Sequence, residues 1–127
     1  MSASKPRVLN VGQCDYDHGN IRRMLSEEFG ADVERAADTE EAVRAVRAGH
    51  FDLVLVNRVF DADGSSGLDL IRQLQSDEAT RATPLALVSN YPEAQETAVA
   101  LGAQRGFGKD KLTSPETRDQ LASLLER

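Results

Sequence analysis

The side chains with the clearest chemical potential stand where short apolar segments end. Asn57 follows the aliphatic run 53–56, Ser89 ends a second apolar run, and Lys109 follows a third. A carboxylate at position 57 could accept a phosphoryl group, whereas the neutral amide of Asn57 is a poor nucleophile and cannot form an acyl phosphate. The chain is thus arranged around a phosphoryl chemistry whose nucleophile is missing.

The elements that must position these residues alternate along the chain. Five apolar runs alternate with amphipathic stretches, which is typical of an α/β fold with a parallel sheet covered by helices on both faces. The predicted strands are Val8–Val11, Asp32–Ala36, Asp52–Asn57, Leu85–Ser89 and Gln104–Phe107. Three predicted helices have clear bounds: about Asp17 to Phe29, Pro92 to Leu101, and Pro115 to Arg127. Another is capped by Asp38 and stops at Gly49. A further helix contains Leu68, Ile71 and Leu74 at helical spacing.

The strand patterns also predict positions in the sheet. The segment Asp32–Ala36 has the weakest apolar character and is expected at an edge, whereas Asp52–Asn57 has four consecutive aliphatic residues and suits a central strand buried on both faces. Ligands of such sheets bind at the carboxyl ends of the strands, near the point where the strand order reverses. The residues expected to converge there are Gly12, Gln13, Asn57, Ser89, Asn90 and Lys109.

Four segments, VLNV, DLVLVN, PLALVSN and GAQRGFGK, resemble the receiver domain of two-component response regulators. They occur in the family's order and close to its spacing, over essentially the whole chain. The resemblance implies a flavodoxin-like (βα)5 fold, a doubly wound five-stranded parallel sheet of strand order 2-1-3-4-5, and a single receiver-like domain over residues 1–127.

The resemblance also assigns site positions. In that family two acidic residues after the first strand bind magnesium together with the phosphoacceptor aspartate, and a hydroxyl residue and a lysine hold the phosphoryl oxygens. Gly12 and Gln13 take the places of the acidic pair and Asn57 that of the phosphoacceptor, while Ser89 and Lys109 match the two phosphate contacts. Because Mg²⁺ prefers carboxylate and water oxygens, we expect no metal and no cofactor.

The loss of carboxylates leaves two expectations to compare with the structure. The segment from Val11 to Gly30 is about one residue longer than the family pattern, so Asp15 or Asp17 bending back toward the site is an open alternative. If the loss were simple decay, restoring aspartate at positions 12, 13 and 57 together would restore magnesium binding and acyl phosphate formation.

Two further departures concern the relay to the family's output face. The family has proline after the lysine, where this chain has Asp110, and an aromatic residue on the fifth strand, where Gly106 stands. That aromatic ring reports the state of the hydroxyl residue by swinging inward. Glycine has no side chain to swing, so we expect this relay to be absent.

The remaining polar groups favour structural roles over reactive ones. We expect Lys109 to bond Asn57 or a loop carbonyl; the alternative is an anion ligand, since the five site positions sum to a charge of +1. Cys14 has no basic sequence neighbour to activate its thiolate and is expected to be partly buried and unreactive rather than a redox sensor. His18 and His50 form no ligand pair and are expected at the surface.

A short acidic segment, Asp61 to Gly64, looks like the start of a calcium loop. The twelfth position from Asp61 is Arg72, where such a loop needs a bidentate glutamate, so a solvated turn is expected.

Composition limits the function classes. The chain has 127 residues, 40% hydrophobic and 28% charged, which suits one globular domain. Its 15 Lys and Arg against 21 Asp and Glu give a net charge of −6, which disfavours binding to nucleic acid. The apolar runs are too short to span a bilayer, the start of the chain has no signal segment, and the single cysteine cannot form an internal disulfide, so a cytoplasmic protein is expected.

Taken together, these features predict a receiver-like signalling module of a two-component or phosphorelay-type system, a pseudo-receiver that works without phosphorylation by protein–protein interaction. Its partner would be a signalling protein, an output domain or a second copy, bound through the face formed by Pro92–Leu101, Gln104–Phe107 and Pro115–Arg127. The alternative is a domain that senses a small anion or metabolite. Phosphorylation on another carboxylate is a third hypothesis, and an enzyme is not expected because the site has no nucleophile with a base.

Overall fold

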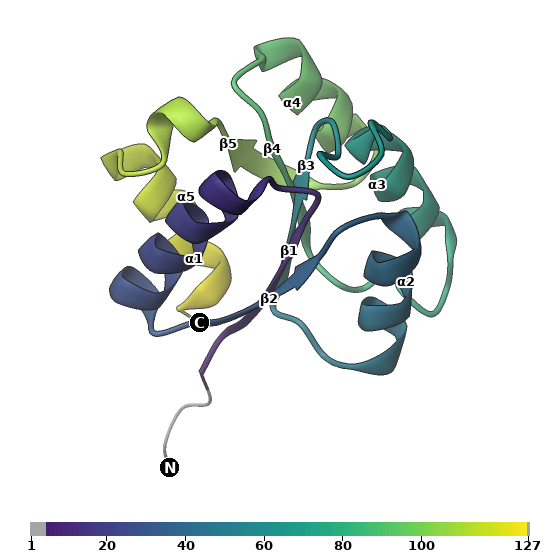
Figure 1. Ribbon diagram of the computed structural model, residues 1–127, viewed down its shortest axis with the longest axis horizontal. Helices are drawn as coiled ribbons and strands as arrows, with labels where there is room; N and C mark the ends of the chain where they lie inside the picture. The colour runs from purple at the N-terminus through teal and green to yellow at the C-terminus, as the bar shows by residue number, and fades with distance from the viewer. Residues whose placement is uncertain (1–4, 127) are drawn as a thin grey trace.

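The computed structural model describes residues 5–126 and contains one parallel sheet of strand order β2-β1-β3-β4-β5 (Figure 1). Helices α1 and α5 cover one face and α2, α3 and α4 the other. The strands are β1 (Arg7–Val11), β2 (Asp32–Ala36), β3 (Leu53–Asn57), β4 (Leu85–Val88) and β5 (Gln104–Phe107). The helices are α1 (Asp15–Phe29), α2 (Thr39–Ala48), α3 (Gly67–Ser76), α4 (Pro92–Ala100), α5 (Pro115–Leu125) and a 3₁₀ turn, η1 (Lys109–Lys111).

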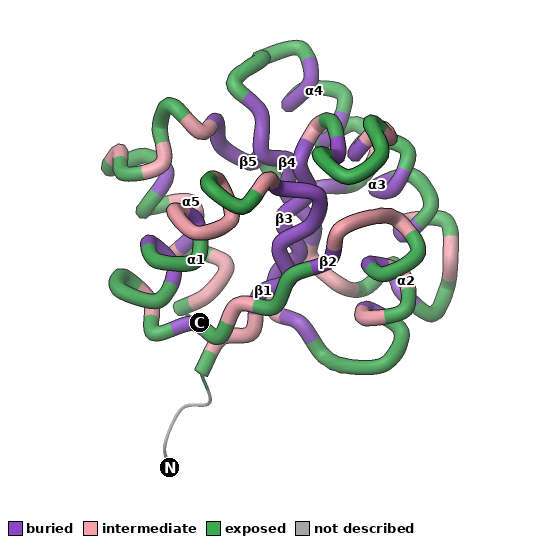
Figure 2. The backbone as a smooth tube through the Cα atoms, viewed as in Figure 1, coloured by how far each residue is buried: buried purple, intermediate pink, exposed green. Residues whose placement is uncertain are grey.

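Two hydrophobic cores flank the sheet. One joins alternate residues of β1, β3 and β4 to Ile21, Leu25 and Leu121 of α1 and α5. The other joins the opposite faces of those strands to α2, α3 and α4. All residues of β3 are buried, which follows from its non-alternating aliphatic sequence and its central place in the sheet (Figure 2).

The predicted fold class, strand order, edge position of β2 and central position of β3 are confirmed. The capping predictions hold as well: the Asp38 carboxylate accepts the N–H of Glu41, the Ser114 hydroxyl accepts the N–H of Thr117, and Gly30 ends α1 with a left-handed φ of 63°. No helix among residues 5–126 is both long enough and apolar enough to cross a bilayer.

Several predicted boundaries were wrong by one or two residues. Helix α1 begins at Asp15 rather than Asp17, because an acidic residue is favourable in the first turn of a helix. Strand β1 begins at Arg7 rather than Val8, and β3 at Leu53 rather than Asp52, whose carboxylate accepts the N–H of Arg7.

Three element ends also differ. Ser89 lies beyond β4, where its hydroxyl accepts the N–H of Tyr91, and α4 ends before Leu101, whose N–H bonds the carbonyls of Thr97 and Ala98 in a tightened last turn. Helix α5 ends at Leu125, and Arg127 lies outside the described residues, as do residues 1–4 at the predicted signal-free start.

Candidate functional site at the carboxyl end of the sheet

The predicted site residues only partly share one cavity. A cavity of about 220 Å³ lies where β3, β4 and β5 end, and Asn57, Ser89, Asn90 and Lys109 all line it. Gly12 adjoins this cavity through its carbonyl, which accepts a hydrogen bond from Asn57. Gln13 instead borders a separate cavity on the β2 side of the sheet.

Asn57 is held in place by its amide nitrogen. Nδ2 donates to the carbonyl of Gly12 at 3.0 Å and to the carbonyl of Val59 at 2.7 Å, and the residue is only 9% exposed. Gly67 lets α3 begin directly against this position, because a Cβ there would lie 1.9 Å from the Asn57 carbonyl oxygen. A carboxylate could make neither donation, so the amide itself joins the loop after β1 to the loop after β3.

The space beside Gly12, which the resemblance places at the family's first acidic position, is filled by an aromatic ring. Gly12 has a left-handed φ of 79°, and a Cβ there would lie 2.2 Å from Cδ1 of Phe60, which is itself 1% exposed. The N–H of Asp61 donates to the Gly12 carbonyl at 2.9 Å and holds the loop over that position. The loop after β1, where the family carries a magnesium ligand, is therefore packed directly against Phe60.

This packing decides how well the site fits magnesium. Among the described residues, no group of three or more His, Cys, Asp or Glu side chains is placed to hold a metal ion. At the family's ligand positions, the Asn57 amide and the Gly12 carbonyl are bonded to each other, and Gln13 offers a neutral amide, so no carboxylate is present for a hard dication. Restoration of magnesium binding by aspartate at 12, 13 and 57 stays a prediction, and the structure adds that Phe60 would have to move to admit a side chain at position 12.

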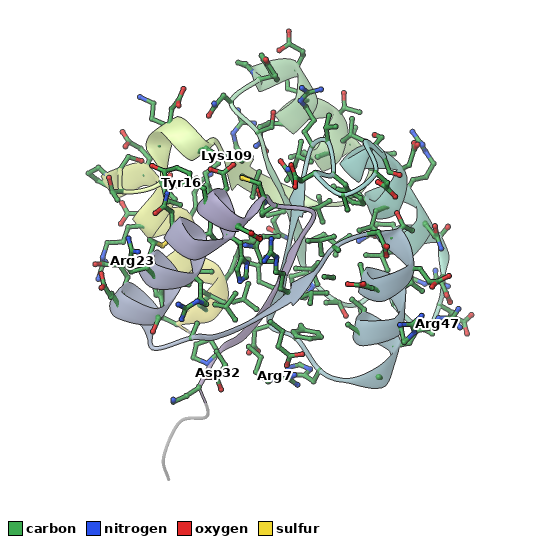
Figure 3. The ribbon with its side chains drawn as sticks, in the orientation of Figure 1. Arg7, Tyr16, Arg23, Asp32, Arg47 and Lys109 are labelled. Atoms are coloured by element: carbon green, nitrogen blue, oxygen red, sulfur yellow. The ribbon has the colours of Figure 1, made fainter. Side chains whose placement is uncertain are left out.

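Lys109 does not have the partner that we predicted. Its Nζ lies 2.7 Å from Oδ2 of Asp17 in the first turn of α1, rather than against Asn57 or a loop carbonyl. Figure 3 shows Lys109 near Tyr16, which belongs to the same turn. Asp17 thus turns toward Lys109 without lining the cavity, whereas Asp15 pairs with Arg35 at 2.7 Å, so rescue of a metal site by either carboxylate stays a hypothesis. The five predicted site positions carry a summed charge of +1, and adding the Asp17 carboxylate brings this sum to zero.

Cys14 belongs to the same cluster. Its thiol donates to Oδ2 of Asp17 at 3.4 Å, and the residue is partly buried, as predicted. The thiol thus joins the N-terminal end of α1 to the Asp17 carboxylate, and its lack of reactivity stays a prediction.

The polar groups after β4 are used to shape the loop. The Ser89 hydroxyl accepts the N–H of Tyr91 at 3.1 Å at the start of α4, and Oδ1 of Asn90 accepts the N–H of Asp110 at 3.1 Å. The second contact ties the β4 end to the η1 turn that carries Lys109. These groups therefore build the wall of the cavity as well as lining it.

Gln13 lies apart from these contacts. It is 3% exposed, and neither atom of its amide has a hydrogen-bond partner within the described part of the chain. Its carbonyl accepts Nη2 of Arg35 at 3.1 Å. The cavity beside it measures about 330 Å³ and also touches Asp15, Arg35, Glu41 and Asp61.

Gly106, which the resemblance places at the position of the switch aromatic, is bonded by Gln95 of α4. Its Nε2 donates to the carbonyls of Leu87 at 2.9 Å and Ser89 at 3.1 Å, and its Oε1 accepts the N–H of Gly106 at 2.9 Å. A bulge between β4 and β5 brings Gly106 so close that a Cβ would lie 1.8 Å from the Leu87 carbonyl oxygen. One buried amide thus fastens α4 to both strands.

Sequence reasoning missed Gln95 and Phe60. The signal for Gln95 was a polar residue on the buried face of a helix, between Ala94 and Ala98. The signal for Phe60 was one large apolar residue inside an otherwise polar loop. Both positions are informative because they break the local pattern.

The isolated histidines and the acidic turn have different outcomes. The surface prediction was wrong for His18, which is partly buried with Nδ1 3.0 Å from Nδ2 of Asn10, and right for exposed His50. Burial lowers the pKa of His18, and the positive charges of Arg35 and Arg22 lower it further. The segment containing Asp63 is an exposed turn, as predicted, in which the Ser65 N–H bonds the Asp63 carboxylate and lowers its pKa.

Comparison with solved structures defines the class of fold. No protein-family model matches the chain. The signal receiver domain of a DNA-binding response regulator from Colwellia psychrerythraea superposes with a TM-score of 0.79 at 19% identity, covering 97% of this chain and 100% of that one. The receiver domain of a sensor histidine kinase from Pseudomonas aeruginosa, with a magnesium ion in its active site cleft, gives 0.71 at 22%, covering 98% and 97%. The chain has the response regulator receiver fold.

A sequence relative adds homology. The chain is 30% identical over 128 residues to the sensor protein GacS of Pseudomonas syringae pv. syringae, a match that covers 98% of this chain. It spans only 14% of the length of that protein. This chain is thus homologous to one segment of a much longer sensor.

Proposed function

We propose that the protein is a receiver-like module of a two-component or phosphorelay-type system that works without phosphorylation. The observation that carries this proposal is the pair of hydrogen bonds from the Asn57 amide to the carbonyls of Gly12 and Val59. Where a receiver needs a reactive carboxylate, this chain uses a neutral donor as a structural link. The packing of Phe60 against Gly12 supports the same proposal.

The module is proposed to act by protein–protein interaction rather than as an enzyme. Its partner surface is the face formed by α4, β5 and α5, where Arg105 and Lys111 are exposed and form no ion pair among the described contacts. The bonds of Gln95 fix α4 and β5 in this surface. The homology to GacS supports a signalling protein or an output domain as the partner.

The experiment combines intact mass with thermal melting, with and without magnesium and acetyl phosphate. We expect no phosphoryl adduct and no rise in melting temperature, because position 57 has no nucleophile and the site no metal ligands. A phosphoryl adduct on the folded protein would contradict the proposal. Peptide mapping would then test Asp17, the carboxylate beside Lys109, and an Asp17→Asn variant would have to lose the adduct.

A second candidate function is the sensing of a small anion. The cavity of about 220 Å³ is lined by two cations, Arg58 and Lys109, and by no acidic residue, although Asp17 pairs with Lys109 from outside the lining. Inorganic phosphate and sulfate are the probes. A rise in melting temperature that is lost in Arg58→Gln, without any adduct, would favour this function over the first.

A further inference from the structure

A groove runs between the β3–α3 loop and α4, and it adjoins the α4–β5–α5 face, with which it shares α4 and Tyr91. Its volume is about 450 Å³. Two large apolar side chains lie on its rim, Val59 with 42% and Tyr91 with 54% of their surface exposed. The groove is lined by Arg58, Val59, Gly64, Ser66, Leu68, Tyr91, Glu93, Ala94 and Thr97. It is therefore an apolar channel between protruding side chains.

The groove also presents one free charge of each sign. The guanidinium of Arg58 stacks over the ring of Tyr91 at 4.8 Å and has no carboxylate partner among the described residues. Glu93, on the first turn of α4, has no cationic partner within the same residues. Most other exposed Arg side chains of the fold are already paired, so this pair of open charges can be satisfied from outside.

Both walls of the groove are held rigidly. The loop wall is fixed by the Asn57 amide and by Phe60, which is buried under it. The helix wall is fixed by Gln95, which bonds β4 and β5 from the buried side of α4. A surface that is ordered before binding loses less conformational entropy on association.

We propose that this groove is a contact between two copies of the chain related by a two-fold axis. In a two-fold interface every contact occurs twice, so a patch must complement itself in charge and shape. Arg58 of each copy then meets Glu93 of the other, and the protruding Tyr91 and Val59 of each copy enter the other's channel. Because the contact consists of one groove and two ion pairs, we expect a weak, reversible dimer that leaves β5 and α5 uncovered.

Sedimentation velocity of the wild-type protein over about 10 µM to about 1 mM tests the proposal, since weak dimers dissociate in this range. We expect concentration-dependent dimerisation that Arg58→Glu or Glu93→Arg weakens at least roughly ten-fold, because each change places two like-charge pairs in the interface. An equimolar mixture of these two variants should dimerise again, since both contacts become attractive. The double variant carrying both changes should dimerise by itself for the same reason.

Arg105→Glu is the matched control, because it makes the same change in net charge on the α4–β5–α5 face. It should leave the dimer unchanged. A monomer at every concentration, loss of the dimer in Arg105→Glu but not in Arg58→Glu, or no recovery in the mixture would each overturn the proposal. The inference goes beyond the proposed function, because self-association is measured without phosphodonor or signalling partner and can fail while the absence of phosphorylation holds.

Discussion

Two regions of the molecule are each held by one buried amide side chain, and they differ in what the amide joins. Asn57 joins the loops that follow β1 and β3. Gln95 joins helix α4 to strands β4 and β5. Under the proposed function, the first amide stands in place of a reactive carboxylate, and the second fixes a region that the resemblance to receivers would make mobile. The comparison shows that one amide can fasten either two loops or a helix and two strands of the same sheet.

The two amides also differ in how much structure depends on them. Asn57 makes two donations and its loops have other support, including the packing of Phe60. Gln95 satisfies two carbonyls and one N–H inside the sheet, at a bulge where the ladder between β4 and β5 is interrupted. Removing a partner from a buried polar group costs more than the bond contributes, so the Gln95 region should be the more sensitive one.

The largest effect is expected from Gly106→Tyr, which puts an aromatic side chain back at the switch position. The new Cβ would lie 1.8 Å from the Leu87 carbonyl oxygen, so β5 must move away from β4. We expect a loss of roughly 3 to 5 kcal/mol in the free energy of unfolding, measured by urea denaturation.

Gly19→Ala on α1 is the control for that substitution. A Cβ there meets nothing within 4 Å, and alanine should stabilise the helix by about 0.5 to 1 kcal/mol. If Gly106→Tyr were as stable as the wild type, the bulge between β4 and β5 would be able to rearrange without cost. Position 106 could then hold a mobile aromatic side chain.

Gln95→Leu should have the next largest effect. The change replaces the amide with an apolar side chain of similar size and leaves the carbonyls of Leu87 and Ser89 and the N–H of Gly106 without their partner. We expect a loss of about 2 to 4 kcal/mol and faster hydrogen exchange at the Gly106 amide. The same change at exposed Gln73 should lie within about 0.5 kcal/mol of the wild type, and equal losses at both positions would remove the distinction drawn for Gln95.

Asn57→Asp should cost less, about 2 kcal/mol at neutral pH, because a carboxylate would face two carbonyl oxygens. This repulsion raises the pKa of the new carboxyl in the folded state, so the variant should recover stability at low pH and lose it as pH rises through that pKa. Urea denaturation from acidic to neutral pH measures the difference. A variant as stable as the wild type at neutral pH would show that the scaffold still accepts an acidic residue there.

The fold was predictable because its signals are local and repeated. The aliphatic run ending at Asn57 and the weak strand Asp32–Ala36 determined the centre and the edge of the sheet. Capping residues such as Asp38 and Ser114 located helix starts through hydrogen bonds between near neighbours in sequence. Element ends were less predictable, since the extent of β3 depends on a bond from Asp52 to the distant Arg7.

The site was only partly predictable, because its contacts join residues far apart in sequence. The ends of β3, β4 and β5 identified Asn57, Ser89 and Lys109 as neighbours of one cavity. The pairing of Lys109 with Asp17 depends on where α1 begins, and α1 started two residues earlier than predicted. Side-chain identity at a strand end thus predicts which groups meet, but not which of them bond.

The smallest effect is predicted for a third amide, that of Asn10 on β1, which can be compared with those of Asn57 and Gln95. Its Nδ2 lies 3.0 Å from Nδ1 of His18. Burial and the charges of Arg35 and Arg22 lower the pKa of His18, and only Asp15 opposes them. A lowered folded-state pKa means that the unfolded chain binds the proton more readily. The stability that neutral His18 contributes is therefore fully present above the ordinary histidine pKa of 6.5, and it is lost as the pH falls through the folded-state pKa.

We expect the wild-type protein to lose a small part of its stability between about pH 7.5 and about pH 5.5 through this residue. His18→Gln should flatten that part of the pH profile, and Arg35→Gln should raise the pKa of His18 in an NMR titration, because it removes one of the opposing charges. If the stability of His18→Gln changed with pH as steeply as that of the wild type, the contact of the Asn10 amide would not depend on a neutral His18 imidazole. The Asn10 contact would then differ from the hydrogen bonds of Asn57 and Gln95, which require an amide side chain.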